Sequence, residues 1–276
     1  MATLNLIESG MDEILRNLPA GARVLDLGSL TGSFPADRCP GAVVVRLDLE
    51  KPAAGSPRGF VQADAARLPF PDHCFDAVIA NHSLEHIRHF ENALGEIGRV
   101  ACPTGSLYIA VPDASTFSDW LYRFVYRGGG HINPFRSAEA LKSEIARCTG
   151  LKFQGSRSLY SSFRYLNRCY FQKRPPRRLW LAGNGNRVFI MLLSYAARRM
   201  DRVFGTRLSA YGWALYFGKL AEPVESARWT NVCVGCGSGF PAAWLLEANL
   251  VRRHLSVFRS YACPACHSDN FFTPDD

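Results

Sequence analysis

A short apolar run that contains an acid and then turns on two glycines is the feature that most constrains this chain. Val24–Leu27 forms the run, Asp26 lies within it, and Gly28 and Gly32 frame the turn that leads to Phe34. Glycines at such a turn let backbone amides approach a bound nucleotide-like ligand closely. The pattern therefore predicts a buried parallel strand that enters a ligand-binding loop.

Further apolar runs alternate with helical or turn segments along the first 160 residues. Strands are predicted at 23–27, 42–47, 59–62, 75–80, 106–111 and 151–159. Apolar residues at helical spacing predict helices at 90–100 and 136–149, the second with Ser137 as N-cap and Gly150 as stop, and an amphipathic helix at 1–21. This alternation is typical of an α/β fold with a parallel sheet covered by helices.

Polar residues follow each of the first four predicted strands. Ligands of open parallel sheets bind at the carboxyl ends of the strands, so these residues are expected to share one site. Asp48 after the second strand can accept both hydroxyls of a ribose, and Asp64 after the third can accept from an adenine amine. Asn81 and His82 follow the fourth strand.

In this order and spacing the motifs resemble those of class I S-adenosylmethionine-dependent methyltransferases of the small-molecule type. The matching stretches are 24–34, 43–50, 60–69, 75–87 and 93–112, within about residues 20 to 155. The resemblance implies a Rossmann-like seven-stranded sheet whose last strand, predicted at 213–218, is antiparallel. It also implies S-adenosylmethionine as cofactor and a set of cofactor-binding residues, which are Asp26, Gly28, Ser29, Gly32, Asp48, Leu49, Asp64, Ala65, Asn81 and His82. One residue departs from the family pattern, because Leu30 stands where a third glycine is usual.

Two histidines are candidates for removing a proton from a hydroxyl acceptor, which histidine can do near neutral pH. His131 follows three glycines in a loop after the fifth strand, and His86 follows the fourth strand near the expected methyl group. His131 is the preferred base. Local packing of either ring is the competing interpretation.

Two Cys-x-x-Cys pairs near the C-terminus predict a structural zinc site. Cys233 and Cys236 form the first pair, Cys263 and Cys266 the second, with glycine or proline beside each turn. Four thiolates at this spacing can surround one Zn²⁺ tetrahedrally, and the assembly resembles a zinc ribbon. The domains are predicted to be a methyltransferase domain at 1–222 and a zinc ribbon at 228–276.

The positive charge is concentrated in one segment. Residues 152–207 carry thirteen Lys or Arg and one acid, a net +12, which leaves −4 for the rest of a chain whose total is +8. The segment is predicted to be a partly helical insertion within 152–212, with a helix at about 186–204. It could cap the substrate, lie on an anionic membrane surface or grip nucleic acid, the last being the least favoured.

These observations predict methyl transfer from S-adenosylmethionine to a small-molecule or glycan acceptor, at a hydroxyl. The stretches Gly128–Phe135 and Gly212–Gly218 resemble bacterial methyltransferases of surface-polysaccharide synthesis. An RNA methyltransferase that uses the ribbon and the insertion, and a non-catalytic zinc-ribbon adaptor with a degenerate fold, are the alternatives. Nine cysteines without a signal peptide indicate a reducing compartment, hence the cytoplasm, with peripheral membrane contact as an option. Neither the identity of the acceptor nor the oligomeric state follows from the sequence.

Overall fold

Apolar β-rich runs pair into one seven-stranded sheet in the computed structural model, which describes residues 10–53, 55, 57–127, 130–167, 186–224, 228–254 and 258–274. The order is β3-β2-β1-β4-β5-β7-β6, and β7 runs antiparallel to both of its neighbours. The strands are β1 (Arg23–Leu27), β2 (Val43–Asp48), β3 (Phe60–Gln62), β4 (Phe75–Asn81), β5 (Ala101–Pro112), β6 (Phe153–Tyr160) and β7 (Ala210–Gly218). The predicted sheet and its antiparallel last strand are confirmed.

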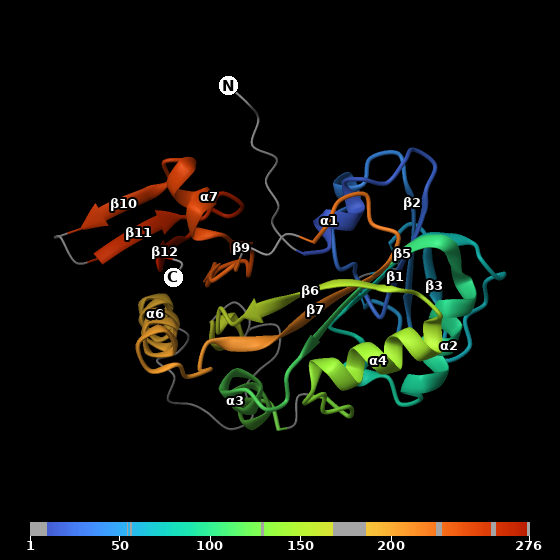
Figure 1. Ribbon diagram of the computed structural model, residues 1–276, viewed down its shortest axis with the longest axis horizontal. Helices are drawn as coiled ribbons and strands as arrows, with labels where there is room; N and C mark the ends of the chain where they lie inside the picture. The colour runs from blue at the N-terminus through green and yellow to red at the C-terminus, as the bar shows by residue number, and fades with distance from the viewer. Residues whose placement is uncertain are drawn as a thin grey trace.

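Two capped helices, α2 (Phe90–Val100) and α4 (Ala138–Thr149), lie together on one face of the sheet (Figure 1). In α2 the apolar side chains at i, i+1, i+4 and i+7 from Ala93 are buried against the sheet, as their spacing predicts. In α4 the Ser137 hydroxyl accepts from the Ala140 amide, and Gly150 ends the helix at a φ of 68°. Both predicted helices are confirmed.

One helix beside the large sheet was missed, and one is shorter than predicted. The helix α3 (Phe117–Val125) begins at Thr116, whose hydroxyl accepts from the Asp119 amide, a capping pattern visible in the sequence. Of the amphipathic helix predicted at 1–21, residues 1–9 lie outside the described residues, and α1 covers only Asp12–Leu15. The proline at position 19 disfavours a longer helix, because a residue before proline avoids helical backbone.

Between β6 and β7 the chain forms a separate layer beside the ends of these strands. It contains the long helix α6 (Arg187–Phe204), which agrees with the predicted 186–204. Residues 168–185 of the predicted insertion lie outside the described residues. Because β6 takes residues 153–160, the segment between the two strands is 161–209.

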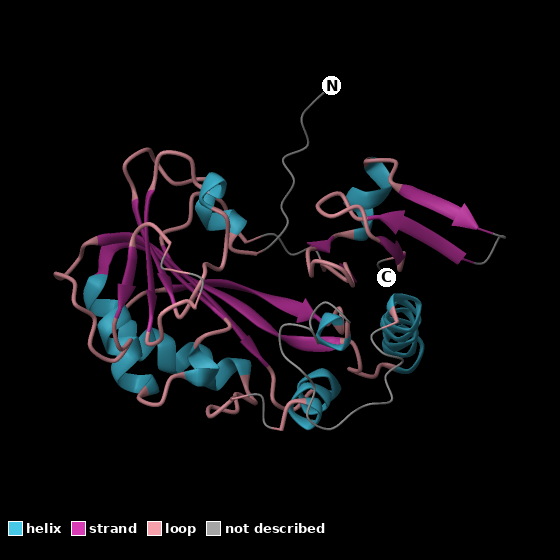
Figure 2. Cartoon of the chain, turned by 180° about the vertical axis from the view of Figure 1, so that it is seen from behind, coloured by secondary structure: helices cyan, strands magenta, loops and turns pink. Residues whose placement is uncertain are grey.

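The C-terminal residues form a small β domain with a core of its own, drawn above α6 in Figure 1 and again from behind in Figure 2. A three-stranded sheet of β10 (Val251–His254), β11 (Phe258–Ala262) and β12 (Asp269–Phe271) accompanies β8 (Asn231–Val232), β9 (Gly239–Phe240) and the short helix α7 (Ala242–Glu247). Its core is Phe240, Leu245, Tyr261 and Phe272 with two buried cysteines.

Arginines from the sheet domain and α6 hold this small domain in place. The Arg198 guanidinium donates to the Val232 carbonyl at 3.1 Å, and Arg157 lies 4.0 Å from the Trp229 ring centroid. Arg164 donates to the Cys236 carbonyl, and Arg187 to the Ser268 hydroxyl. Guanidinium groups suit such contacts because their donors are fixed in one plane and their faces stack on aromatic rings.

Candidate functional site

A cavity of about 880 Å³ opens at the carboxyl ends of β1, β2 and β3, and we call it the strand-tip cavity. Its volume lies in the range of small-molecule and cofactor sites. The lining includes Gly28, Leu30, Asp48, Leu49, Asp64 and Ala65, and also Ser83 and His86. Five of the predicted cofactor residues therefore share one space, at the position that the topology of an open parallel sheet predicts.

Two of the carboxylates that line this cavity, Asp48 and Asp64, are held in place by backbone amides. The Asp48 Oδ2 accepts from the Leu30 amide at 2.8 Å, and its Oδ1 accepts from the Glu50 amide at 3.1 Å. The Asp64 Oδ1 accepts from the Ala66 amide at 2.9 Å. Each carboxylate has further lone pairs for a ligand, because an ionised carboxyl offers about four acceptor positions.

The glycine turn after β1 is shaped by its neighbours inside the protein. Gly28 has a φ of 66°, and a Cβ there would lie 2.5 Å from the Ser83 Cβ. Gly32 has a φ of 112°, and a Cβ there would lie 2.6 Å from the Arg46 Nε. Leu30 adopts a left-handed φ of 45°, a region that favours glycine, and its side chain, 38% exposed, forms part of the cavity wall.

Five of the predicted cofactor residues lie outside the lining of the strand-tip cavity, and three of these five support the turn after β1. The Asp26 carboxyl is fully buried, accepts from the Ser33 amide at 2.8 Å and lies 3.8 Å from the Arg46 guanidinium. Burial raises the pKa of Asp26. The Ser29 hydroxyl donates to the Asp26 carbonyl, so Asp26, Ser29 and Gly32 support the turn from within.

A loop fastened to the end of β4 borders the strand-tip cavity on its other side. The amides of Ile132 and Asn133 donate to the Glu85 carbonyl, and the His86 Nδ1 donates to the Gly130 carbonyl at 2.9 Å. Gly130 and Ile132 line the strand-tip cavity. Of the three glycines before His131, Gly128 and Gly129 lie outside the described residues.

On the far side of this loop lies a second cavity of about 470 Å³, which we call the histidine cavity. His82, Glu85, His86 and His131 line it, together with Tyr122, Tyr160, Tyr165 and Tyr211. His86 lines both cavities, so it marks their junction. Asn81 borders a third cavity, near Ser33 and Trp229, and His82 lines both this cavity and the histidine cavity.

The His131 ring is oriented by a buried carboxylate. Its Nδ1 lies 3.0 Å from the Asp119 Oδ1, and Asp119 also pairs with the Arg123 guanidinium at 2.9 Å. Because an imidazole that donates from Nδ1 leaves Nε2 as its acceptor, this contact fixes His131 as a base when it is neutral. The sequence analysis missed Asp119, although it lies in the capping pattern that begins α3.

Burial shifts the acidity of two further groups in the histidine cavity. Glu85 is 1% exposed, and burial raises the pKa of its carboxyl to about 8. Burial also lowers the pKa of His82, 3.8 Å away, to about 4. One Glu85 oxygen, one His86 nitrogen and one His131 nitrogen all lie within 4.8 Å of one another. Shifted groups that converge in one cleft are typical of catalytic sites.

The four C-terminal cysteines form one cluster, which fits a zinc ion. Cys233 and Cys266 have their sulfurs 3.6 Å apart, as do Cys236 and Cys263. Sulfurs bound at about 2.3 Å to one tetrahedral zinc lie roughly 3.8 Å apart, whereas a disulfide requires about 2.05 Å. The Gly235 amide and the Asn270 side chain both donate to the Cys233 sulfur, which favours a thiolate. The cluster is therefore consistent with the predicted zinc ribbon.

Comparisons with known proteins agree with the geometry of the strand tips. A family model described as a methyltransferase domain matches residues 25–109. A demethylmenaquinone methyltransferase of Thermus thermophilus is 39% identical over 103 residues, which cover 33% of this chain and 47% of that protein. A ubiquinone/menaquinone biosynthesis C-methyltransferase, UbiE, of Stutzerimonas stutzeri is 38% identical over 106 residues, or 32% and 41% of the two chains. The match thus spans about half the length of these curated relatives.

Solved structures match a larger share of the chain at low identity. A S-adenosylmethionine-dependent methyltransferase from Archaeoglobus fulgidus is 19% identical, covers 75% of this chain and 88% of that chain, and has a TM-score of 0.48. The sheet order, the strand-tip cavity and the family model together identify residues 25–109 as part of a class I S-adenosylmethionine-dependent methyltransferase domain.

Proposed function

We propose that the whole protein transfers a methyl group from S-adenosylmethionine to a hydroxyl of a small-molecule or glycan acceptor. The observation that carries the proposal is the junction of two cavities at His86, with the predicted cofactor residues on one side and an oriented base on the other. The cofactor supplies a methyl group on a sulfonium, which is already activated toward a nucleophile. The protein then has to align the acceptor, exclude water and take up a proton.

The strand-tip cavity is assigned to the adenosine end of the cofactor. Asp48 would accept from the ribose hydroxyls, and Asp64 with Ala65 would meet the adenine, since all three residues line this space. Gly28 has no Cβ, so the backbone of the turn can lie close to the Ser83 side chain. Asn81 and His82 are assigned to the sulfonium end, where they border the neighbouring cavities.

The histidine cavity is assigned to the acceptor. His131, held by Asp119, would accept the hydroxyl proton at its Nε2, and His86 at the junction would position the reacting group. The four tyrosines of the lining offer faces on which a sugar or another ring can stack, and hydroxyls for polar contacts. The relative from Stutzerimonas stutzeri is named a ubiquinone/menaquinone biosynthesis C-methyltransferase, so a carbon acceptor is the second candidate; a base at His131 serves either acceptor.

Replacing His131 tests the assignment of base. His131→Gln should lower the rate of methyl transfer from labelled S-adenosylmethionine into extract metabolites by about 10²- to 10⁴-fold, the usual contribution of a general base. Binding of S-adenosylhomocysteine should stay unchanged. His73→Gln is the matched control, because the His73 ring contacts the Ala101 carbonyl, away from the cavities. Equal rates in the His131 variant and the control would contradict the assignment.

A peripheral membrane contact remains a proposal, and α6 offers the surface for it. No helix in the described ranges is both long enough and apolar enough to cross a bilayer. One side of α6 nevertheless leaves large apolar side chains exposed, which are Val188, Phe189, Leu192, Met200, Val203 and Phe204. Arg199 lies among them, as is typical of helices that lie in a membrane interface.

A further inference from the structure

A fourth space, which we call the arginine cavity, lies between the ends of β6 and β7, α6 and the small β domain. It measures about 220 Å³, and its lining includes Arg198, Arg202, Arg207 and Arg228 but one acid, Asp201. Its volume is below the range of sites that enclose a whole small molecule. It is therefore suited to a single group of a larger ligand.

The Asp201 carboxylate in this lining accepts hydrogen bonds from residues of the loop that follows α6. The Asp201 Oδ1 accepts from the Thr206 hydroxyl and the Leu208 amide, and the Oδ2 accepts from the amide and hydroxyl of Ser209. These contacts fold the chain after α6 back on the helix. A second carboxylate, Asp113, lies outside the lining and pairs with Arg207 at 2.8 Å. Four guanidinium groups thus line the space, and Asp201 is the one acid in its lining.

Arg198 supplies the observation that points to a ligand. The residue is 5% exposed, its Nη2 donates only to carbonyl groups, and its Nε has no hydrogen-bond partner. No carboxylate lies within ion-pair distance of Arg198 in the part of the chain that the structure describes. Asp201 and the Cys233 sulfur act on Arg198 without a hydrogen bond, and the groups that accept from it are neutral, so the cost of burying this cation is only partly offset. An anion in the cavity would offset more of that cost.

The arginine cavity adjoins the histidine cavity. Leu159 and Tyr160, at the end of β6, line both spaces. An acceptor whose reacting group lies near His131 can therefore extend past these residues toward the arginines. Guanidinium groups bind phosphate oxygens in pairs, which makes a phosphoryl group the anion that this lining fits best.

We propose that the arginine cavity binds a phosphate or diphosphate group of the methyl acceptor. The inference rests on the proposed function for the position of the reacting group, while the anion site itself stands on the arginine lining. Such a group can belong to a nucleotide-linked or to a lipid-linked acceptor, and the shared chemistry is the phosphoryl anion.

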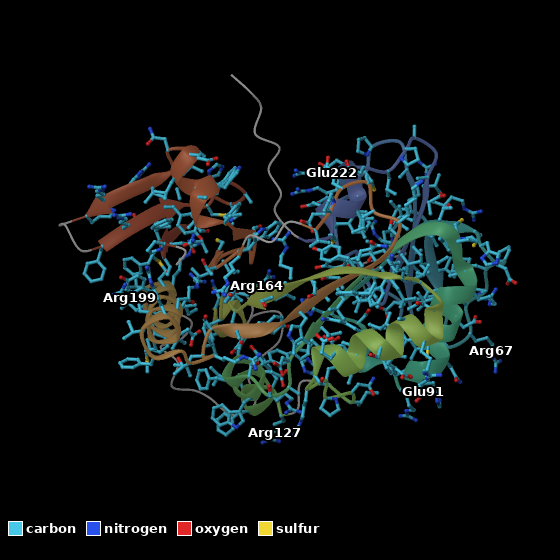
Figure 3. All side chains as sticks on the ribbon, viewed as in Figure 1. Arg67, Glu91, Arg127, Arg164, Arg199 and Glu222 are labelled. Carbon is cyan, nitrogen blue, oxygen red and sulfur yellow. The ribbon has the colours of Figure 1, made fainter. Side chains whose placement is uncertain are left out.

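The test compares two arginines of the same helix. Arg202 lines the cavity, whereas Arg199 is exposed on α6 and is not part of the lining; it is labelled in Figure 3. Titration calorimetry of the full zinc-loaded chain with inorganic pyrophosphate, at fixed ionic strength, should show binding that Arg202→Gln weakens about 10-fold, the usual effect of losing a charge-assisted hydrogen bond. Arg199→Gln should bind like the wild type. Absence of pyrophosphate binding, or equal weakening in both variants, would overturn the proposal.

Competition experiments identify the source of the phosphoryl group. Displacement of pyrophosphate by a nucleoside diphosphate supports a nucleotide-linked acceptor, and displacement by phosphatidic acid vesicles supports a lipid-linked one. Displacement by an RNA oligonucleotide that depends equally on Arg199 and Arg202 would instead indicate a general basic surface and overturn the site. S-Adenosylhomocysteine binding, measured on the same samples, tests the proposed function separately.

Discussion

At the residue scale, the Glu85 carboxyl is almost completely withdrawn from water. Its backbone carbonyl holds the loop before α4, while its side chain is buried beside His82 and His131 with one oxygen unsatisfied. A neutral carboxyl is the favoured state there, because burial disfavours the charged form. The protein thus keeps a protonated acid next to its candidate base.

This burial predicts a decline of stability with rising pH. Folded Glu85 keeps its proton up to about pH 8, whereas in the unfolded chain it loses the proton near 4.5. Between these values the unfolded state binds fewer protons, so the free energy of unfolding falls by up to about 1.4 kcal/mol per pH unit. His82, with a folded pKa of about 4 and an ordinary value of 6.5, acts in the opposite direction below pH 6.5. The net decline is therefore expected between pH 6.5 and 8.

Urea denaturation of Glu85→Gln at pH 5, 6.5 and 8 checks this expectation. The variant should gain stability relative to the wild type as the pH rises. Its glutamine cannot ionise, whereas the wild-type Glu85 carboxyl ionises more readily in the unfolded chain than in the folded protein. Glu139→Gln, an exposed acid whose side chain is 83% accessible, is the control. Parallel pH profiles for Glu85→Gln and the wild type would show that Glu85 is ionised in the folded protein.

At the element scale, the helices and strands that could be predicted are those marked by an apolar pattern or a capping residue in their own sequence. The helices α2 and α4 carry a regular apolar face or explicit caps, and the strands β1, β2 and β4 are short apolar runs before a turn. The antiparallel direction of β7 came from the family resemblance, whereas its position between β5 and β6 was not predicted, since strand order is a long-range property that no local pattern encodes. The helix α3 was missed although Thr116 and Asp119 form a capping pair.

The small β domain is the element whose folding should depend on metal. About fifty residues bury few apolar side chains, and domains of this size need a staple such as zinc.

Metal analysis should give one zinc per chain for the wild type and well under one for Cys263→Ser. Cys148→Ser, a change in α4 outside the cluster, should keep the metal. S-Adenosylhomocysteine binding should persist in Cys263→Ser, because the strand-tip cavity has no residue from this domain. Full zinc retention in Cys263→Ser would contradict the assignment.

At the scale of the whole molecule, the site combines segments that are far apart in the sequence. The residues Gly28, Asp48 and Asp64 could be predicted because each follows its own strand, and the topology brings strand ends together. Of the histidine cavity, only His82, His86 and His131 were predicted as site residues. The rest of the lining could not be predicted, since it comes from α3, β6, β7, the small β domain and the segments that follow β4 and β6. Arg164, labelled in Figure 3, illustrates this: it follows β6, lines that cavity and contacts the Cys236 carbonyl.

The proposed function requires that the strand-tip cavity binds the adenosine end of the cofactor. Calorimetric titration of S-adenosylhomocysteine into the wild type, Asp48→Asn and Asp37→Asn tests it most directly. Asp48 lines the cavity, while Asp37 is an exposed acid away from it. We expect the wild type and Asp37→Asn to bind S-adenosylhomocysteine with equal affinity. Asp48→Asn should bind about 10-fold more weakly, because charge-assisted hydrogen bonds to the ribose are lost. Absence of binding to the wild type, or equal affinity in all three proteins, would contradict it.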